Sequence, residues 1–399
     1  MGIDKTRGPD EVRVAAMETT GPASTSAGRG TGPGWRYRNV LAGDPAPTFR
    51  QRSSGNPDYV FGSAAGRYLV LCFFQSSTDE QGRCALSILA DHRALFDDAK
   101  ASFFGVSVDP ADEQRLEQSL PGVRWFFDHD LKISRLYGAA SLEDGGPPRR
   151  LWVVVDPTLR VAAVIPMRSD GADRDELIRL IKALPPIGML GGMETTAPIL
   201  HLPNVFEAAL CEQLIGAYRA KGGEPSGFMV ERDGKTVVAT DPNHKRRRDL
   251  LLGDPALIRA ARERIHRRIV PEIKKVHQFN VTRMERYLVA LYDEAERGHF
   301  RAHRDNTTKG TAHRRFAVSI NLNDDFDGGE IGFPEYGPRT YKPQRGAAIV
   351  FSCSLLHAVS PVTRGERFAF LPFLYDDAAA KVREANMPFL ENGNASYRA

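Results

Sequence analysis

The sequence predicts a protein of two domains, an α/β domain followed by a β-rich domain. Three observations lead to this fold class. The chain has 399 residues, and at roughly 150 residues per domain this length suits two or three domains. Before residue 187, apolar runs of strand length alternate with segments of helical periodicity, which is typical of an α/β layer fold. After residue 280, many short strands alternate with turns, as in a β-sandwich or jelly roll.

The composition predicts a folded chain without a nucleic-acid or membrane partner. Hydrophobic residues make up 42% and charged residues 26% of the chain, which excludes a largely disordered protein. The net charge of +4 is too small to indicate nucleic-acid binding. No run of 18 apolar residues and no secretory h-region is present, so we expect a cytoplasmic protein. A homodimer is left open.

The four cysteines lie far apart in the sequence and form no CxxC pair. This spacing excludes a disulfide framework and a cysteine zinc site. Reduced thiols in a cytosol are the simplest interpretation.

The first domain is expected over residues 35–187, after a disordered tail over 1–34 that is rich in Gly, Ser, Thr and Pro. A stretch rich in Pro, Gly and Met over 188–199 is expected to be the linker. Periodicity predicts, in chain order, a strand over 68–74, a helix over 84–97, a strand over 102–108, a helix over 111–119, strands over 151–155 and 161–164, and a helix over 172–184.

The second domain is expected over residues 200–380, with a C-terminal tail over 381–399. One helix is expected near 206–221, and a second begins with Asp254 as N-cap and Pro255 in its first turn. The expected strands that follow are 285–292, 299–304, 315–322, 329–333, 347–351, 357–362 and 366–373.

A candidate metal site begins with the sequence His303-Arg304-Asp305. In a strand, side chains two apart point to the same face, so His303 and Asp305 would converge. An isolated pair of this kind is most often a surface histidine near an aspartate. However, a second histidine, His357, follows an apolar strand downstream. Two histidines and one carboxylate are the ligand set of non-haem Fe(II) oxygenases, which leaves coordination positions open.

Arg367 lies ten residues after His357, in a predicted strand. A period of two places Phe368 and Phe370 on one face of this strand, and Arg367 would then project into the barrel. A guanidinium inside a barrel needs an anion, and its fork shape suits the distal carboxylate of a dicarboxylic acid.

With these motifs, region 200–375 resembles the iron- and 2-oxoglutarate-dependent dioxygenases of the prolyl 4-hydroxylase-like branch. The similar segments are 292–305, 319–323, 328–333, 346–351 and 357–367. The resemblance implies a double-stranded β-helix, or jelly roll, with flanking helices. It also implies that His303, Asp305 and His357 are the iron ligands and that Arg367 pairs with the distal carboxylate of 2-oxoglutarate.

The same resemblance implies a hydroxylase that uses Fe(II), 2-oxoglutarate and O₂, with ascorbate as an optional reductant. An aliphatic C–H of an amino acid, a peptidyl residue or a related small molecule would be hydroxylated as succinate and CO₂ are released. Halogenation is not expected, because the aspartate ligand leaves no vacant site for chloride. Tyr292 resembles the tyrosine that hydrogen-bonds the co-substrate. Tyr287 is the alternative, because Tyr292 precedes His303 by a residue or two more than the family pattern implies.

Other polar residues near the motif are not expected to be metal ligands. His299 and His313 are expected on the surface or in a substrate loop. A helical zinc pair of His299 and His303 would lack the glutamate of HExxH, and the flanking pattern is strand-like. The basic segment 244–248 is interpreted as a solvated loop or as the lip of a substrate pocket.

The segment 40–187 resembles the peroxiredoxin branch of the thioredoxin fold. The resemblance implies a catalytic cysteine at the start of the helix after the first core strand, activated by an arginine and the helix N-terminus. Here the proline of the motif is missing, and counting from Thr78 places Gln81 where the nucleophile belongs. Cys84 follows three residues later, and Arg150 resembles the activating arginine. Two roles stay open: a scaffold or binding module for a substrate or partner, and a thiol peroxidase or redox sensor through Cys84.

Overall fold

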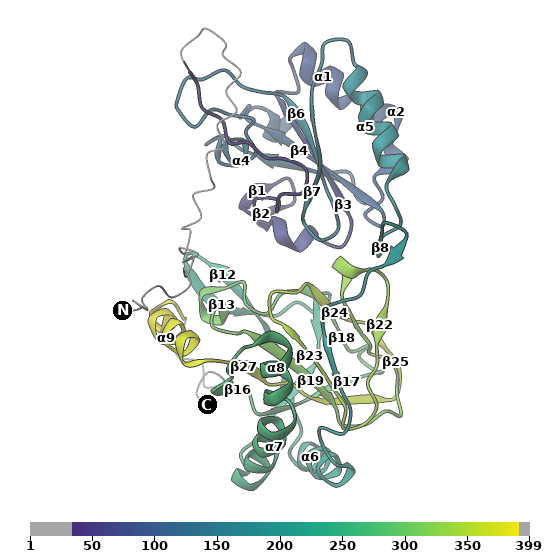
Figure 1. The fold of residues 1–399 in the computed structure, drawn as a ribbon, viewed down its shortest axis with the longest axis vertical. Helices are drawn as coiled ribbons and strands as arrows, with labels where there is room; N and C mark the ends of the chain where they lie inside the picture. The colour runs from purple at the N-terminus through teal and green to yellow at the C-terminus, as the bar shows by residue number, and fades with distance from the viewer. Residues whose placement is uncertain (1–33, 391–399) are drawn as a thin grey trace, which may run out of the picture.

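The computed structural model describes residues 34–390 and confirms the two-domain architecture. Figure 1 shows an N-terminal half, drawn at the top, stacked on a C-terminal half, with strand β8 (Met189–Leu190) close to where they meet. The tail predicted over residues 1–34 lies outside the described residues, apart from its last residue. Within residues 34–390, no helix has the length and apolar character needed to cross a membrane.

The N-terminal half is built on one seven-stranded mixed sheet with the strand order β2-β1-β5-β4-β3-β6-β7. Strand β3 runs parallel to β4, and β4 runs parallel to β5, whereas β6 is antiparallel to β3. An apolar core covers each face of this sheet, which explains why β3 is an unbroken apolar run rather than an alternating one. The strands are β1 (Arg50–Ser53), β2 (Asn56–Val60), β3 (Tyr68–Gln75), β4 (Ala101–Ser107), β5 (Val123–Phe127), β6 (Leu151–Val155) and β7 (Val161–Pro166).

Two helices of this half are shorter than the sequence pattern predicts. The helix expected over 84–97 is broken into α1, α2 and a 3-10 turn, η2 (Arg93–Leu95). The helix expected over 111–119 ends at Arg115, because Leu116 is extended and the Glu117 carbonyl accepts a hydrogen bond from the Trp125 indole. The terminal helix α5 agrees with its prediction. The helices are α1 (Glu80–Leu86), α2 (Ile88–Asp91), α3 (Asp112–Arg115), α4 (Lys132–Leu136) and α5 (Ala172–Ala183).

The C-terminal half has two facing sheets, and this arrangement confirms the predicted jelly roll. The larger sheet has the strand order β10-β23-β19-β26-β17-β15-β11, with β16 and β27 beside it, and the smaller has the order β14-β18-β24-β21-β22. The larger sheet is formed by β10 (Leu200–Leu202), β11 (Glu224–Pro225), β15 (Arg248–Leu251), β16 (Arg283–Glu285), β17 (Leu288–Asp293), β19 (Phe316–Asn321), β23 (Ala348–Ser352), β26 (Glu366–Phe370) and β27 (Phe373–Tyr375).

The smaller sheet and three two-stranded sheets complete the strands of this half. The smaller sheet is formed by β14 (Lys245–Arg246), β18 (His299–His303), β21 (Ile331–Gly332), β22 (Thr340–Tyr341) and β24 (His357–Val359). The remaining pairs are β8 with β9 (Met193–Glu194), β12 (Phe228–Arg232) with β13 (Lys235–Ala239), and β20 (Asp327–Gly328) with β25 (Val362–Arg364).

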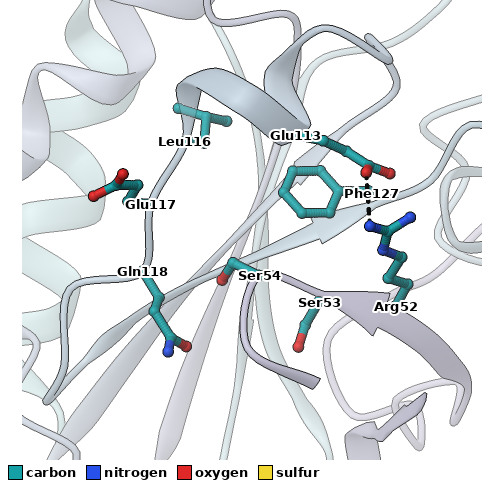
Figure 2. Close-up of a pocket in the computed structure, with 8 residues that line it drawn as sticks. All are labelled: Arg52, Ser53, Ser54, Glu113, Leu116, Glu117, Gln118 and Phe127. Carbon is teal, nitrogen blue, oxygen red and sulfur yellow. Dashed lines mark ion pairs between the residues drawn. The ribbon is translucent and has the colours of Figure 1, made fainter. Parts of the chain in front are cut away.

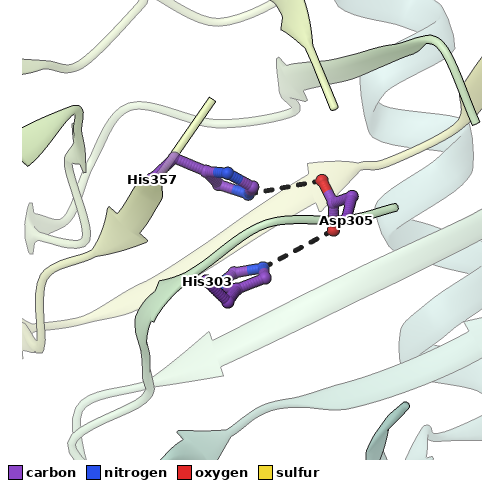
Figure 3. A group of neighbouring side chains, drawn as sticks. All are labelled: His303, Asp305 and His357. Atoms are coloured by element: carbon purple, nitrogen blue, oxygen red, sulfur yellow. Dashed lines mark ion pairs between the residues drawn. The ribbon is translucent and has the colours of Figure 1, made fainter. Parts of the chain in front are cut away.

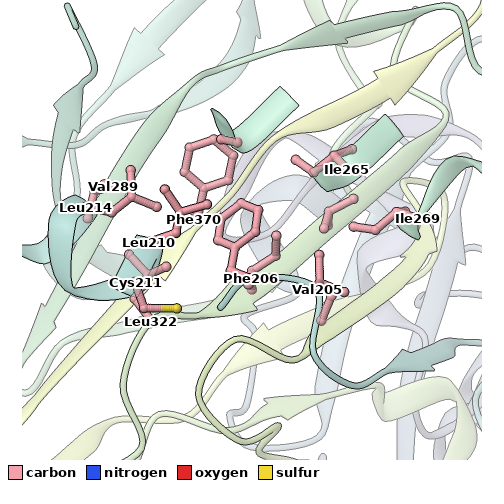
Figure 4. Packing of buried hydrophobic residues seen from close by; sticks show 14 of the residues in the cluster. Val205, Phe206, Leu210, Cys211, Leu214, Ile265, Ile269, Val289, Leu322 and Phe370 are labelled. Atoms are coloured by element: carbon pink, nitrogen blue, oxygen red, sulfur yellow. The ribbon is translucent and has the colours of Figure 1, made fainter. Parts of the chain in front are cut away.

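Three helices cover the outer face of the larger sheet. They are α6 (Ala208–Lys221), α7 (Pro255–Arg268) and α8 (Val270–His277). Asp254 caps α7 by accepting a hydrogen bond from Ala256 N, as the sequence predicts. Figure 4 shows apolar side chains of α6 and α7 against Val289 of β17 and Phe370 of β26. Fully burying each large apolar side chain contributes roughly 1.5–3 kcal/mol.

A separate apolar cluster lies between the two sheets, around the inward-facing residues Tyr292, Phe300 and Phe351. This interior contains the candidate site. Helix α9 (Asp377–Asn386) extends beyond residue 380, where the second domain was predicted to end, and Asn386 donates a hydrogen bond to the Lys309 carbonyl.

Candidate metal centre and co-substrate site

The structure brings the three predicted iron ligands together on the smaller sheet. His303 is the last residue of β18 and is paired in register with His357, the first residue of β24. Asp305 follows two residues after His303, and one ligand atom from each residue lies within 4.8 Å of the others. His303 Nε2 lies 3.5 Å from Asp305 Oδ1, and His357 Nε2 lies 3.3 Å from Oδ2 (Figure 3).

Backbone carbonyls set the orientation of both imidazoles. The Nδ1 atom of His303 lies 2.8 Å from the Arg301 carbonyl, and that of His357 lies 3.0 Å from the Leu355 carbonyl. A carbonyl oxygen only accepts, so each Nδ1 carries the proton and each Nε2 keeps a lone pair. Both lone pairs therefore face the carboxylate of Asp305, which is the arrangement that a metal ion requires.

Aromatic rings pack against both histidine ligands. Phe300 stacks on His303 with centroids 3.5 Å apart, and Phe351 lies 4.6 Å from His357. Burial, followed by the neighbouring His357 ring, lowers the pKa of His303 to about 4. Burial alone would raise the pKa of Asp305, but the two imidazoles hold it below its usual range. A neutral His303 imidazole beside an ionised Asp305 carboxylate suits the binding of a divalent cation.

The predicted co-substrate arginine lies inside the barrel. Arg367 is 1% exposed and is paired in register with Tyr292 on the neighbouring strand. Its Nε donates to Asn321 Oδ1 at 3.1 Å, and its Nη2 donates to Ser319 Oγ at 2.9 Å. Among residues 34–390, Nη1 has no hydrogen-bond partner and no carboxylate forms an ion pair with Arg367. A buried guanidinium without a counter-ion is costly, so this site fits a bound carboxylate.

Tyr292, rather than the alternative Tyr287, lies in this interior. The Arg367 guanidinium carbon lies 5.1 Å from the centroid of the Tyr292 ring. Tyr292 OH also accepts a long hydrogen bond, 3.4 Å, from Arg247 Nη1. Tyr287 packs instead against the apolar cluster beneath the outer helices.

The interpretation of segment 244–248 as a solvated loop is wrong, since it enters strands β14 and β15. Lys245 and Arg247 are both about 7% exposed. Alternate residues of a strand face the same side, so Lys245, Arg247 and Asp249 all point inward. Arg247 Nη2 and Nε bind the Asp249 carboxylate at 2.6 and 2.7 Å. Opposite charges two residues apart are the sequence signal that could have revealed this buried ion pair.

Lys245 extends the ring stack on the metal side of the barrel. Its Nζ lies 4.8 Å from the Phe300 centroid and donates to Ser226 Oγ and the Gly227 carbonyl. Because Phe300 also stacks on His303, the ammonium, the phenyl ring and the imidazole form one continuous column. No motif in the sequence indicates this contact.

The surface position expected for His313 is also wrong. His313 is fully buried, with its Nε2 2.9 Å from Glu285 Oε2, because Glu285 on β16 binds both it and Arg314 inside the domain. His299 is half-buried in strand β18, so the alternative of a helical zinc pair with His303 is wrong. Its Nδ1 contacts the Arg297 carbonyl at 2.8 Å.

The buried ion pairs of Glu285 lead us to expect that the free energy of unfolding falls in acid. Burial alone would raise its pKa, but Arg314 and His313 lower it below the ordinary value. The contribution of Glu285 is therefore complete above the unfolded pKa of about 4.3 and falls as the pH drops towards the folded pKa. Glu285→Gln should cost about 3 kcal/mol at neutral pH and should flatten the fall in unfolding free energy below pH 5. Urea unfolding between pH 3.5 and 7 measures both effects, and equal pH slopes in the two proteins would contradict the assignment.

In the N-terminal half, the arginine that resembles a peroxiredoxin arginine does not face a thiol. Arg150 binds both carboxylate oxygens of Asp79 and the Gln81 side-chain oxygen, each at 2.8 Å. Asp79 is also the N-cap of α1, where it accepts from Gly82 N. Cys84 lies half-buried within α1 rather than at its start. A carboxylate and an amide therefore occupy the position in which the family places its thiolate.

A polar pocket of about 360 Å³ opens elsewhere on this half, as Figure 2 shows. It lies beside the ion pair of Arg52 with Glu113, 2.9 Å long, and the Phe127 ring. None of its lining residues belongs to the sites predicted from the sequence.

Comparison with known proteins finds relatives of the C-terminal region. Residues 287–375 match the 2OG-Fe(II) oxygenase superfamily. A PKHD-type hydroxylase of Cupriavidus metallidurans is 37% identical over 95 residues, which cover 21% of this chain and 42% of that protein. PKHD-type hydroxylase NE2125 of Nitrosomonas europaea is 31% identical over 107 residues, which cover 24% of this chain and 47% of that protein. The chain thus spans less than half the length of these curated relatives.

Solved structures resemble each half of the chain at low identity. A prolyl hydroxylase from Trichoplax adhaerens, solved with a hypoxia inducible factor peptide, is 15% identical and covers 48% of this chain and 87% of its own, with a TM-score of 0.38. The peroxidoxin BcpB of Mycobacterium tuberculosis is 20% identical and covers 37% of this chain and 99% of its own, with a TM-score of 0.30. The superfamily match spans His303, Asp305, His357 and Arg367. The C-terminal region of this chain therefore carries a 2OG-Fe(II) oxygenase domain.

Proposed function

We propose that this protein is an Fe(II)- and 2-oxoglutarate-dependent dioxygenase that hydroxylates an aliphatic C–H and releases succinate and CO₂. The substrate class that we propose is an amino acid, a peptidyl residue or a related small molecule. One observation carries the proposal: a His-Asp-His triad and a buried arginine, which has no carboxylate partner among residues 34–390, lie in the same barrel.

The residues fit the two groups that this chemistry needs. His303, Asp305 and His357 would hold Fe(II), which, when bound with 2-oxoglutarate, supplies the activation of O₂. Arg367 would bind the distal carboxylate of 2-oxoglutarate through Nη1. Ser319 and Asn321 fix the guanidinium by occupying two of its other donors.

Tyr292 and the aromatic side chains have separate tasks in this proposal. The phenol of Tyr292, held by Arg247, lies beside Arg367 and can donate to the same co-substrate. Phe300 and Phe351 keep water away from the imidazoles and hold their planes in position. Exclusion of water strengthens every charge interaction inside the barrel.

A pocket of about 370 Å³ supports a polar substrate. It is lined from the N-terminal half by Arg50 and Asp58 and from the C-terminal half by the β12–β13 hairpin and the segment that follows Asp305. Charges of both signs line it, including Glu231 and Lys309. Such a lining suits an amino acid or a peptide, because these molecules carry groups of positive and of negative charge.

Oxygen consumption tests this function directly. The iron-loaded protein should consume O₂ and release succinate when 2-oxoglutarate is added. Both rates should rise when a screen of peptides or amino acids includes the substrate. Pyruvate is the matched control, because it retains the keto acid but lacks the distal carboxylate that Arg367 would bind. Equal rates with pyruvate, or no succinate with any substrate, would contradict the proposal.

We also infer a reducing compartment such as the cytoplasm, because all four cysteines are free. The peroxidase alternative has less support, since Arg150 faces Asp79 and Gln81 rather than Cys84.

A further inference from the structure

Arg304, which lies between two of the candidate metal ligands in sequence, forms a partly buried ion pair. Neighbours in a strand point to opposite faces, so the Arg304 side chain points away from the metal site. Its Nη2 and Nη1 bind Glu335 Oε1 at 2.9 Å and Oε2 at 3.1 Å. The two side chains are 16% and 7% exposed. A forked arginine–carboxylate pair of this kind has a defined geometry.

Glu335 connects this pair to the second half of the metal site. Its Oε2 accepts a hydrogen bond from the backbone N–H of Leu356 at 2.8 Å. Leu356 immediately precedes His357. Arg304 also donates to the Ser354 carbonyl in the same segment. One carboxylate therefore ties the segment of His303 and Asp305 to the segment of His357.

The N-terminal half contacts the same ion pair. Gly62, in the 3-10 turn η1 (Phe61–Ala64), accepts a hydrogen bond from Arg304 Nη2 at 3.2 Å through its carbonyl. Gly66 packs so closely that an added Cβ would lie 2.5 Å from Pro334 Cβ. Pro334 begins the 3-10 turn η4 (Pro334–Tyr336), which carries Glu335.

The predicted linker holds the other end of η4. Thr195 Oγ1 donates to the Tyr336 carbonyl at 3.1 Å. Gly188 approaches Gly337 so closely that an added Cβ would lie 2.8 Å from its Cα. The N-terminal half and the linker thus enclose the turn that presents Glu335.

We infer that the N-terminal half positions the metal ligands of the oxygenase domain through Gly62, Arg304 and Glu335. This inference rests on the proposed function, because it assigns Arg304 and Glu335 as positioning residues for the same iron site. Groups that orient metal ligands from outside typically control metal affinity by 10–100-fold. A merely structural ion pair would instead lower the melting temperature and leave metal affinity unchanged.

Manganese binding tests the inference in the full-length protein, without relying on activity. Free Mn(II) is measured by electron paramagnetic resonance, and Mn(II) replaces Fe(II) because it is stable in air. The variants are Glu335→Gln and the double variant R304M/E335Q, which leaves no unpaired buried charge. Both should bind Mn(II) about tenfold or more weakly than the unmodified protein. Arg339→Met is the matched control, because Arg339 pairs with Glu194 of the linker at an exposed site and should bind normally.

A second pair of variants tests the same inference with substitutions in the N-terminal half. Gly62→Leu should displace Arg304, since a Cβ at Gly62 already lies 3.8 Å from Arg304 Nε. It should weaken Mn(II) binding about tenfold, whereas Ser63→Leu, exposed in the same turn, should not.

The outcomes separate this inference from the proposed function. Failure of the unmodified protein to bind Mn(II) would overturn the proposed function, and the inference with it. Normal binding by the unmodified protein together with affinities within twofold for E335Q, the double variant and Gly62→Leu would overturn the inference alone. Circular dichroism confirms that each variant is folded, and the double variant keeps the test decisive if E335Q does not fold.

Discussion

Asp305→Ala is expected to abolish turnover and to weaken divalent metal binding by more than about 100-fold. The carboxylate supplies the only negative charge of the triad and lies between the two Nε2 atoms. Substitutions outside the ligand shell already cost 10–100-fold, so removal of a ligand should cost more. Succinate release and Mn(II) titration measure the two effects, and His303→Ala should behave in the same way.

The control for this prediction is Asp324→Ala. Asp324 is an exposed carboxylate just after β19, where it accepts from the Arg345 backbone. Its loss should leave both measurements unchanged. Retained 2-oxoglutarate-dependent succinate release in Asp305→Ala and His303→Ala would show that the triad is not the metal site.

Arg367→Met is expected to raise the KM for 2-oxoglutarate at least about 30-fold while Mn(II) affinity stays near normal. Removal of one partner of a buried charge pair costs about 2–5 kcal/mol, and 2 kcal/mol corresponds to a factor of about 30. The variant should fold, because methionine replaces a buried guanidinium that has no carboxylate partner among the described residues. Steady-state kinetics with varied 2-oxoglutarate give the KM.

The matched control for Arg367→Met is Arg364→Met. Arg364 is exposed on β25 and pairs with Asp327, away from the barrel interior. It should leave the KM for 2-oxoglutarate unchanged. Similar KM values for Arg367→Met and the unmodified protein would place the co-substrate carboxylate elsewhere.

The candidate metal ligands and Arg367 could be named from the sequence because each lies in a segment with a local signal. Two residues of a strand share a face, so the spacing of His303 and Asp305 indicates that they converge, and His357 downstream completes the ligand set. The same rule places Arg367 opposite Phe368 and therefore inside the barrel. The broad two-domain organisation follows from strand and helix periodicity for the same reason.

The remaining parts of the site depend on contacts between distant segments. Arg304 and Glu335 are 31 residues apart, and Gly62 is 242 residues from Arg304. No period of strand or helix connects them, so nothing in the sequence alone pairs them. The burial of Lys245 and His313 was missed because polar residues are ordinarily exposed, and only the tertiary fold supplies their partners.

The predicted lengths of two first-domain helices were wrong for a related reason. The apolar spacing over 84–97 suits one helix, but the chain leaves the helical conformation at His92, and a 3-10 turn over Arg93–Leu95 follows. Tertiary packing overrides local propensity in such short segments.

The most direct test of the central claim is anaerobic absorption spectroscopy of the full-length protein. Fe(II) and 2-oxoglutarate are added to metal-free protein, and the visible metal-to-ligand charge-transfer band is recorded. We expect a band that requires both additions, because the triad must hold the iron while Arg367 holds the keto acid against it. Absence of the band in folded protein would mean that the two sites do not form one centre, and it would contradict the assignment of an Fe(II)- and 2-oxoglutarate-dependent dioxygenase.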